Sequence, residues 1–341
     1  MTVLPISPRI VVLGAGAWGT ALALSLARNG RQATLWAFTP ELAKTIDEAR
    51  ENVQFLPGFS LPEAVAVTGD DGAVAHADIV FSVIPSEFLH ATMTRLRGQM
   101  HAGQILVSAT KGLETGTNLR MTQVIANTLG EAGLTDIPVG ALSGPSFAME
   151  VAEGQPTVVT VAFADHAVAA LVQREVSSQT LRLYTSSDVI GVELGGALKN
   201  VIAIAAGVAA GVGLGHNSSA GLITRGIAEI TRLAVACGAR RETLSGLSGL
   251  GDLVLTCTGS LSRNRTVGME LGHGRELREI LDSLGGKVAE GVLTTRAALE
   301  LARQHRVEMP IAEQMELILD KGKDPHEAIR DLMLRPGKHE H

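Results

Sequence analysis

The sequence has few aromatic residues and no excess of positive charge. Only 3% of its 341 residues are Phe, Trp or Tyr, so rows of side chains that stack on bare nucleobases are not expected. Asp and Glu outnumber Lys and Arg by 35 to 29, and the formal net charge at pH 7 is -6. Proteins that bind nucleic acid or an anionic membrane usually carry a basic surface. We therefore expect no nucleic-acid partner, and any anionic ligand must be bound by local groups.

Cysteine is scarce as well. Cys237 and Cys257 are the two cysteines, and their spacing fits no paired metal or redox motif. We interpret them as small, reduced hydrophobic side chains, which suits a cytoplasmic location. The N-terminal sequence MTVLPISPRI lacks the features of a secretory signal. The longest apolar run, residues 201–215, is shorter than the roughly 20 residues of a membrane span, so we expect a buried core helix and no stable membrane insertion.

Short runs rich in Val and Ile alternate with amphipathic stretches up to about Tyr184. Such runs are typical of parallel strands that are buried on both faces. The expected strands lie in RIVVLGAG, ATLWAF, AVAVTGD, DIVFSVIPS, QILVSATKG, PVGALSGPS and TVVTVAF. This pattern predicts the α/β class, with a Rossmann-like, doubly wound, dinucleotide-binding domain in residues 1–187.

The rest of the chain has a helical pattern, and 341 residues are enough for two domains. Ser219 and Thr294 are candidate N-caps, and Gly238 is a candidate helix stop. We expect helices at residues 188–211, 219–237, 275–284, 294–305 and 311–319. The pattern therefore predicts an all-helical, substrate-binding domain in residues 188–341.

A glycine motif follows the first expected strand. Gly14, Gly16 and Gly19 form G-x-G-x-x-G within GAGAWG, directly before a helical stretch. This spacing allows a tight turn, a close backbone approach to a pyrophosphate, and a contact between helix and strand. The motif predicts a dinucleotide site that includes Ala17 and Trp18.

The sequence leaves the choice between NAD and NADP open. An acidic residue that binds the ribose 2′-hydroxyl of NAD is expected about 20 residues after the glycines, at the end of the second strand. That strand ends with Trp36, Ala37, Phe38 and Thr39. These residues include neither a carboxylate nor an arginine that could bind the 2′-phosphate of NADP.

Two later loops carry candidate ligand-binding residues. Lys111 lies in SATKGLE, and Gly144, Ser146 and Ala148 lie in LSGPSFA. Ligands of an open parallel sheet bind beyond the carboxyl ends of its strands. Taken singly, Lys111 also fits a solvated surface lysine, and Gly144 an ordinary turn. Their shared position at one expected sheet edge indicates a ligand site.

Two polar segments interrupt the helical half. The segment LSGLGDLVLTCTGSLSRNRT contains Asp252, Ser262, Arg263 and Asn264, and VAEGV contains Glu290. Arginine binds phosphate oxygens with a fork of N–H groups, and hydroxyl and amide groups complete such a site. The Ser-Arg-Asn-Arg run therefore fits a phosphate site, although an exposed basic loop has the same composition.

Lys199 stands at the head of the apolar run in GALKNVIAIAAG. An ammonium group against so much hydrocarbon needs a partner, a shifted pKa, or a path to solvent. A lysine that simply reaches water is the structural alternative to a catalytic one.

The motifs GAGAWGTA, SATKGLE, LSGPSFA, GALKNVIAIAAG, GLGDLVLTCTGSLSRNR and VAEGV occur in this order in the NAD(P)-dependent glycerol-3-phosphate dehydrogenases. Over nearly its whole length the chain resembles the bacterial members. The resemblance implies reversible hydride transfer between NAD(P)H and dihydroxyacetone phosphate, which gives sn-glycerol 3-phosphate for phospholipid synthesis. It implies that Lys199 transfers the proton. A lysine suits this role if burial and the nearby positive charge of Lys111 lower its pKa.

The resemblance also implies the binding residues. At the glycerol phosphate it places Lys111, Gly144, Ser146, Lys199, Asp252, Ser262, Arg263 and Asn264. At the cofactor, beside the glycine motif, it places Trp18, Phe38, Lys111, Ala148, Arg263, Val288 and Glu290. Members commonly carry Arg or His where this chain has Phe38 or Thr39, which leaves NADP preference open.

Two other functions are compatible with parts of the sequence. A β-hydroxyacid-type dehydrogenase also joins a Rossmann half to a helical half, but the Ser262-Arg263-Asn264 cluster favours a phosphorylated substrate. A non-catalytic dinucleotide sensor has no use for a costly buried lysine. No His, Cys and carboxylate cluster indicates a metal, and a homodimer stays open as the assembly.

Overall fold

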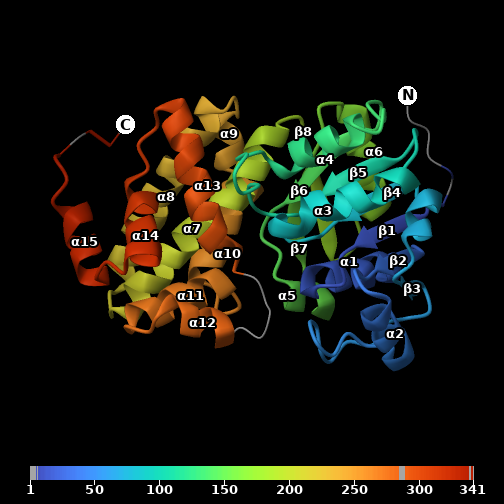
Figure 1. The fold of residues 1–341 in the computed structure, drawn as a ribbon, viewed down its shortest axis with the longest axis horizontal. Helices are drawn as coiled ribbons and strands as arrows, with labels where there is room; N and C mark the ends of the chain where they lie inside the picture. The colour runs from blue at the N-terminus through green and yellow to red at the C-terminus, as the bar shows by residue number, and fades with distance from the viewer. Residues whose placement is uncertain (1–4, 6, 284–288, 338, 341) are drawn as a thin grey trace. The chain divides into compact units, whose positions relative to one another are not determined.

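The computed structural model describes residues 5, 7–283, 289–337 and 339–340. The chain divides into two compact units. The N-terminal unit comprises Met1–Glu114 and Leu119–Glu193, and the C-terminal unit comprises Thr115–Asn118 and Leu194–His341. In Figure 1 the colours of the N-terminal unit run from blue to green, and those of the C-terminal unit run mostly from yellow to red.

An eight-stranded sheet forms the centre of the N-terminal unit, in the order β3-β2-β1-β4-β5-β6-β7-β8. The strands are β1 (Ile10–Leu13), β2 (Ala33–Trp36), β3 (Val65–Thr68), β4 (Ile79–Ser82), β5 (Ile105–Ser108), β6 (Val139–Ser143), β7 (Thr157–Ala162) and β8 (Leu181–Ser186). The helices of this unit are α1 (Ala17–Arg28), α2 (Pro40–Ala49), α3 (Ser86–Leu96), α4 (Met121–Gly130), α5 (Ala148–Glu153) and α6 (His166–Val176), with short 3-10 turns η1 (Asp71–His76) and η2 (Arg97–Gln99). This arrangement confirms the doubly wound α/β fold.

The sheet differs from the expectation at its far edge. All the expected strands are present, but β7 pairs antiparallel with β6, whereas the other neighbours are parallel. The sequence pattern also did not predict β8. In this edge strand buried and exposed residues alternate at its start, so it lacks the continuous apolar run that marks a strand buried on both faces.

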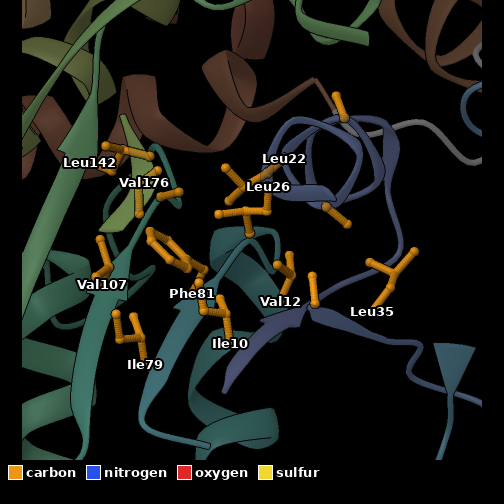
Figure 2. Close-up of a cluster of buried hydrophobic side chains, with 14 of the residues drawn as sticks. Ile10, Val12, Leu22, Leu26, Leu35, Ile79, Phe81, Val107, Leu142 and Val176 are labelled. Carbon is orange, nitrogen blue, oxygen red and sulfur yellow. The ribbon is translucent and has the colours of Figure 1, made fainter. Parts of the chain in front are cut away.

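Both faces of the sheet are packed. Ile10 and Val12 belong to one hydrophobic cluster, and Val11 and Leu13 belong to another. Successive strand side chains point to opposite faces, so alternate residues of β1 serve two cores. Figure 2 shows the first cluster, in which side chains of α1 and of the strands lie together.

The C-terminal unit is helical, and its described residues contain no strand. Its helices are α7 (Val189–Gly211), which begins in the N-terminal unit, α8 (His216–Ala236), α9 (Arg241–Leu244), a π-helical turn η3 (Leu247–Gly251), α10 (Asp252–Thr258), α11 (Arg263–Gly272), α12 (Leu277–Ser283), α13 (Glu290–His305), α14 (Pro310–Lys321) and α15 (Pro325–Met333). The expected helical character is confirmed, although α9, α10, α11 and α15 are elements that the apolar periodicity did not predict.

Two of the expected helix caps are wrong. Gly215 is the N-cap of α8 and Ala289 is the N-cap of α13, so Ser219 and Thr294 lie inside these helices. In both cases the packed helix extends about one turn upstream of the polar residue, because tertiary contacts outweigh a local cap. The helix stop is confirmed, since Gly238 has φ +96° and its N–H donates to the carbonyl of Val235.

Glycines bring α7 and α11 into backbone contact. A Cβ on Gly207 would lie 2.0 Å from the carbonyl oxygen of Arg265, and one on Gly268 would lie 1.9 Å from that of Ile204. No larger residue fits at such an approach. The glycine spacing in the apolar helix therefore sets the position of the Ser-Arg-Asn-Arg segment.

In the described part of the chain, α7 is the one helix long and apolar enough to cross a membrane, but 89% of its most apolar window is buried inside the protein. It is a core helix. At its start, Glu193 accepts hydrogen bonds from the N–H (2.8 Å) and the hydroxyl (2.6 Å) of Thr122 and pairs with Arg120. These contacts fix the first turn of α7 to the start of α4.

Candidate active site

The glycine motif forms a turn that fits a pyrophosphate. Gly14 has φ +110°, and a Cβ there would lie 2.7 Å from the carbonyl oxygen of Val83. A Cβ on Gly19 would lie 1.9 Å from the carbonyl oxygen of Gly14, whereas Gly16 faces open space. Gly16 is the N-cap of α1 and supplies no side-chain cap. The first N–H groups of α1 are therefore suited to bind phosphate oxygens.

A buried asparagine supports this turn from behind. The Nδ2 of Asn52 donates to the carbonyl of Ala15 and to the hydroxyl oxygen of Thr20, both at 2.8 Å. The Thr20 hydroxyl in turn donates to the carbonyl of Gly16 at 2.9 Å. Asn52 is fully buried, so these bonds hold two carbonyls of the turn in place. Sequence reasoning missed Asn52, because a single asparagine far from the motif carries no recognisable signal.

The residues after β2 have separate roles. Phe38 is 56% exposed, as a cofactor-facing residue at the carboxyl end of a strand needs to be. The Thr39 hydroxyl accepts a hydrogen bond from the N–H of Leu42 at 3.2 Å and caps α2. Both side chains are exposed, so a ligand at this end of β2 can contact Phe38 and Thr39 alike.

The structure brings together residues from two later loops of the N-terminal unit. The Nζ of Lys111, after β5, donates to the carbonyl of Gly144, after β6, at 3.1 Å. The hydroxyl of Ser146 donates to the same carbonyl at 2.9 Å. Ala148 follows as the first residue of α5. These residues lie at the carboxyl edge of the sheet, where its ligands are expected.

Lys199 has a partner inside the C-terminal unit. Its Nζ lies 2.7 Å from Oδ1 of Asp252 and donates to the hydroxyl oxygen of Thr256 at 2.6 Å. The side chains of Lys199 and Asp252 are only 7% and 1% exposed. The lysine therefore does not lie along the helix toward solvent. A carboxylate and a hydroxyl compensate for its lost hydration.

Two residues of the Ser-Arg-Asn-Arg segment, residues 262–265, fix its backbone. The Ser262 hydroxyl accepts from the N–H of Arg265 at 3.2 Å and caps α11. The Oδ1 of Asn264 accepts from the N–H of Gly291 at 3.0 Å. Arg263, the first residue of α11, is exposed between these two buried neighbours. The segment thus presents one arginine from a fixed backbone at a helix N-terminus.

Three helices of the C-terminal unit, α7, α11 and α13, meet next to Asn264. A Cβ on Gly291 would lie 2.7 Å from the carbonyl oxygen of Asn200 and 2.8 Å from Oδ1 of Asn264. Glu290, the first residue of α13, therefore lies next to the segment that carries Arg263. The structure brings these predicted residues together, whereas Val288 lies outside the described residues.

Cys257 does not compete with Lys199 for a chemical role. Burial raises the pKa of the Cys257 thiol to about 12, despite the opposing effect of the Lys199 charge. A thiol with this pKa is protonated near neutral pH and is a poor nucleophile. Cys257 is therefore a packing residue beside the lysine.

Comparisons with known proteins agree over both units. Family models described as the N-terminus and the C-terminus of NAD-dependent glycerol-3-phosphate dehydrogenase match residues 9–169 and 188–330. The chain is 57% identical to glycerol-3-phosphate dehydrogenase [NAD(P)+] of Acidobacterium capsulatum, over 97% of this chain and 99% of the relative. It is 49% identical to the protein of the same name from Geobacter sulfurreducens, over 98% and 99%.

A solved structure gives the same result. Glycerol-3-phosphate dehydrogenase from Coxiella burnetii is 38% identical, with a TM-score of 0.92, over 97% of this chain and all of that one. The similarity that the motifs indicated is thus confirmed in sequence and in fold. The chain belongs to the NAD-dependent glycerol-3-phosphate dehydrogenase family.

Proposed function

We propose that this protein is an NAD(P)-dependent sn-glycerol-3-phosphate dehydrogenase, which interconverts dihydroxyacetone phosphate and sn-glycerol 3-phosphate. The observation that carries the proposal is the buried Lys199 ammonium, held by Asp252 and Thr256 in a chain whose two units both match this family. A buried, partnered lysine is the kind of group that handles a proton.

The nicotinamide cofactor, when bound, supplies or accepts the hydride at C2 of the substrate. The protein has to handle the accompanying proton. Lys199 donates a proton from Nζ to the C2 oxygen as the ketone becomes an alcohol, and it takes that proton back in the reverse direction. The Asp252 carboxylate and the Thr256 hydroxyl orient Nζ, so the lysine needs no rearrangement before transfer.

The substrate phosphate is assigned to the start of α11. Arg263 supplies a planar fork of N–H groups, and the helix N-terminus favours negative charge. Ser262 and Asn264 fix the backbone around it through their bonds to Arg265 and Gly291. Lys111, Gly144 and Ser146 are assigned to the glycerol part.

The remaining assignments follow the same proposal. Residues 1–187 bind the cofactor and residues 188–341 bind the substrate. The cofactor residues are Gly14, Gly16, Ala17, Trp18, Gly19, Phe38, Lys111, Ala148, Arg263, Val288 and Glu290. We also propose a cytoplasmic enzyme that supplies glycerol phosphate for phospholipid synthesis, consistent with its two free cysteines.

Initial-rate oxidation of NADH and NADPH tests this function. With dihydroxyacetone phosphate both cofactors should be oxidised, and with unphosphorylated dihydroxyacetone or a β-keto acid the rates should be far lower. Faster turnover of the β-keto acid would contradict the proposal in favour of a hydroxyacid dehydrogenase. No oxidation with any of these substrates would favour a sensor.

A further inference from the structure

An arginine from α3 lies at the carboxyl end of β2. The Nη1 of Arg95 donates to the carbonyl of Phe38 at 3.2 Å. Its Cζ lies 5.3 Å from the ring centroids of both Trp36 and Phe38. Trp36 is the last residue of β2. The Arg95 guanidinium therefore lies beside the end of this strand, where residues 36–39 include no charged residue.

The same guanidinium is paired with a carboxylate. Arg95 donates from Nε to Oδ2 of Asp71 and from Nη2 to Oδ1, both at 2.7 Å. Asp71 begins the short turn after β3, so this two-point pair joins α3 to the loop that follows β3. One positive and one negative group thus meet at the end of β2.

This position determines cofactor choice in dinucleotide-binding folds. The residue about 20 positions after the glycines contacts the adenosine ribose, where a carboxylate favours the 2′-hydroxyl of NAD and an arginine favours the 2′-phosphate of NADP. Here the backbone of Phe38 stands at that spacing, and Arg95 is hydrogen-bonded to it. Arg95 and Asp71 come from distant segments, and they supply the arginine and the carboxylate that residues 36–39 lack.

We propose that Arg95 binds the 2′-phosphate of NADPH and that Asp71 limits this binding, so that the pair sets the ratio of NADPH to NADH use. The inference rests on the proposed function, since it concerns the cofactor of that reaction. The side chains of Arg95 and Asp71 are 38% and 27% exposed, and Phe38 is 56% exposed. A ligand that lies against Phe38 can therefore reach the guanidinium.

The charges give the two residues opposite effects. A guanidinium has five N–H groups in a planar fork, and three of them make the bonds to Asp71 and Phe38, which leaves two for a phosphate. The Asp71 carboxylate repels the same phosphate. The paired state has no net charge, so it also accepts the neutral 2′-hydroxyl of NADH.

The test compares kcat/KM for NADPH and NADH, with dihydroxyacetone phosphate, in three variants. Arg95→Ala should lower the NADPH to NADH ratio at least tenfold, mainly through KM for NADPH. Asp71→Asn should raise the ratio severalfold. Arg97→Ala is the matched control, because it removes the same charge two residues away, where Arg97 pairs with Glu131, and it should leave the ratio unchanged.

Equilibrium binding separates this inference from the proposed function. Calorimetric titration of the wild type and of Arg95→Ala with 2′,5′-ADP and with ADP should show a loss of affinity for 2′,5′-ADP alone, even if the enzyme reduces no triose phosphate. Equal losses of affinity for both nucleotides, or an unchanged ratio in both Arg95→Ala and Asp71→Asn, would overturn the inference. If Arg95→Ala does not fold, Asp71→Asn decides the result by the same measurements.

Discussion

The Nζ of Lys199 lies 2.7 Å from Oδ1 of Asp252, and both side chains are almost completely buried. The two residues come from different helices, α7 and α10. Burial makes each charge depend on the other, because neither can regain its hydration if the partner is removed. The pair is therefore a stabilising contact as well as part of the proposed proton site.

Asp252→Ala should destabilise the protein strongly. Breaking a buried ion pair leaves an uncompensated charge and costs about 3–5 kcal/mol. Urea unfolding measures this change in the free energy of unfolding. Glu48→Ala is the control, since Glu48 pairs with Lys44 and the two side chains are 69% and 74% exposed, and such exposed pairs contribute only about 0–1 kcal/mol. Similar losses in the two variants would contradict the assignment of Asp252 as the buried partner.

Arg263→Ala should weaken use of dihydroxyacetone phosphate much more than use of unphosphorylated dihydroxyacetone. The loss of a charge-assisted hydrogen bond should cost about 1.5–3 kcal/mol in kcat/KM for the phosphorylated substrate. Steady-state kinetics with both substrates measures the difference. If the two substrates lose activity equally, Arg263 does not bind the substrate phosphate.

Asn52→Ala should weaken cofactor binding with little effect on the chemical step. Without the Asn52 amide, the carbonyls of Ala15 and Gly16 lose their support. We therefore expect the dissociation constant for NADH to rise about tenfold. The kcat at saturation should change less than about threefold. Fluorescence titration and steady-state kinetics measure the two effects.

Two further variants test how Asn52 acts. Asn52→Asp should not restore affinity, because a carboxylate cannot donate to the Ala15 carbonyl. Asn29→Ala is the control, since Asn29 donates to the carbonyl of Ser177 and is not part of the turn. A parallel loss of kcat and affinity in Asn52→Ala would show general damage to the fold instead.

Glu229 should make stability depend on pH. Its carboxylate oxygens accept from the N–H groups of Ile311 at 3.1 Å and Ala312 at 3.0 Å, at the start of α14. Burial raises its pKa from 4.5 to about 7, and these two hydrogen bonds oppose the shift. Because the folded-state pKa is the higher one, the stabilising contribution is fully present below pH 4.5 and is lost as the pH rises through about 7.

The variant Glu229→Gln removes this titration. Between about pH 5 and pH 8, the free energy of unfolding of the wild type should fall by up to about 3 kcal/mol more than that of the variant. Urea unfolding at the two pH values gives both numbers. An identical pH dependence of the two proteins would show that Glu229 does not titrate in this range.

Residues close together in sequence were the most predictable part of this protein. The glycine turn, the buried strands and the apolar helix α7 each have a local pattern that follows from backbone geometry and burial. The edge strand β8 lacks such a pattern, since one of its faces is exposed. The antiparallel pairing of β7 depends on how the chain returns to the sheet, which strand composition does not reveal.

The candidate site shows the same limit. The sequence could point to Lys199 and to the Ser-Arg-Asn-Arg segment, because a lone lysine and a basic cluster stand out in apolar surroundings. It could not predict that Asp252 pairs with Lys199, since only the packing of α10 on α7 brings the two side chains together. Asn52 and Arg95 went unnoticed for a similar reason, because each acts on backbone far away in the chain.

The most direct test of the central claim is the kcat of Lys199→Ala with saturating NADH and dihydroxyacetone phosphate. Loss of the proton-transferring group should lower kcat at least about 100-fold, while NADH binding by fluorescence titration stays near that of the wild type. Lys199→Arg should not restore activity, since arginine does not release its proton near neutral pH. A kcat above about one tenth of the wild-type value in either variant would contradict the account, because the proton would then pass through another group.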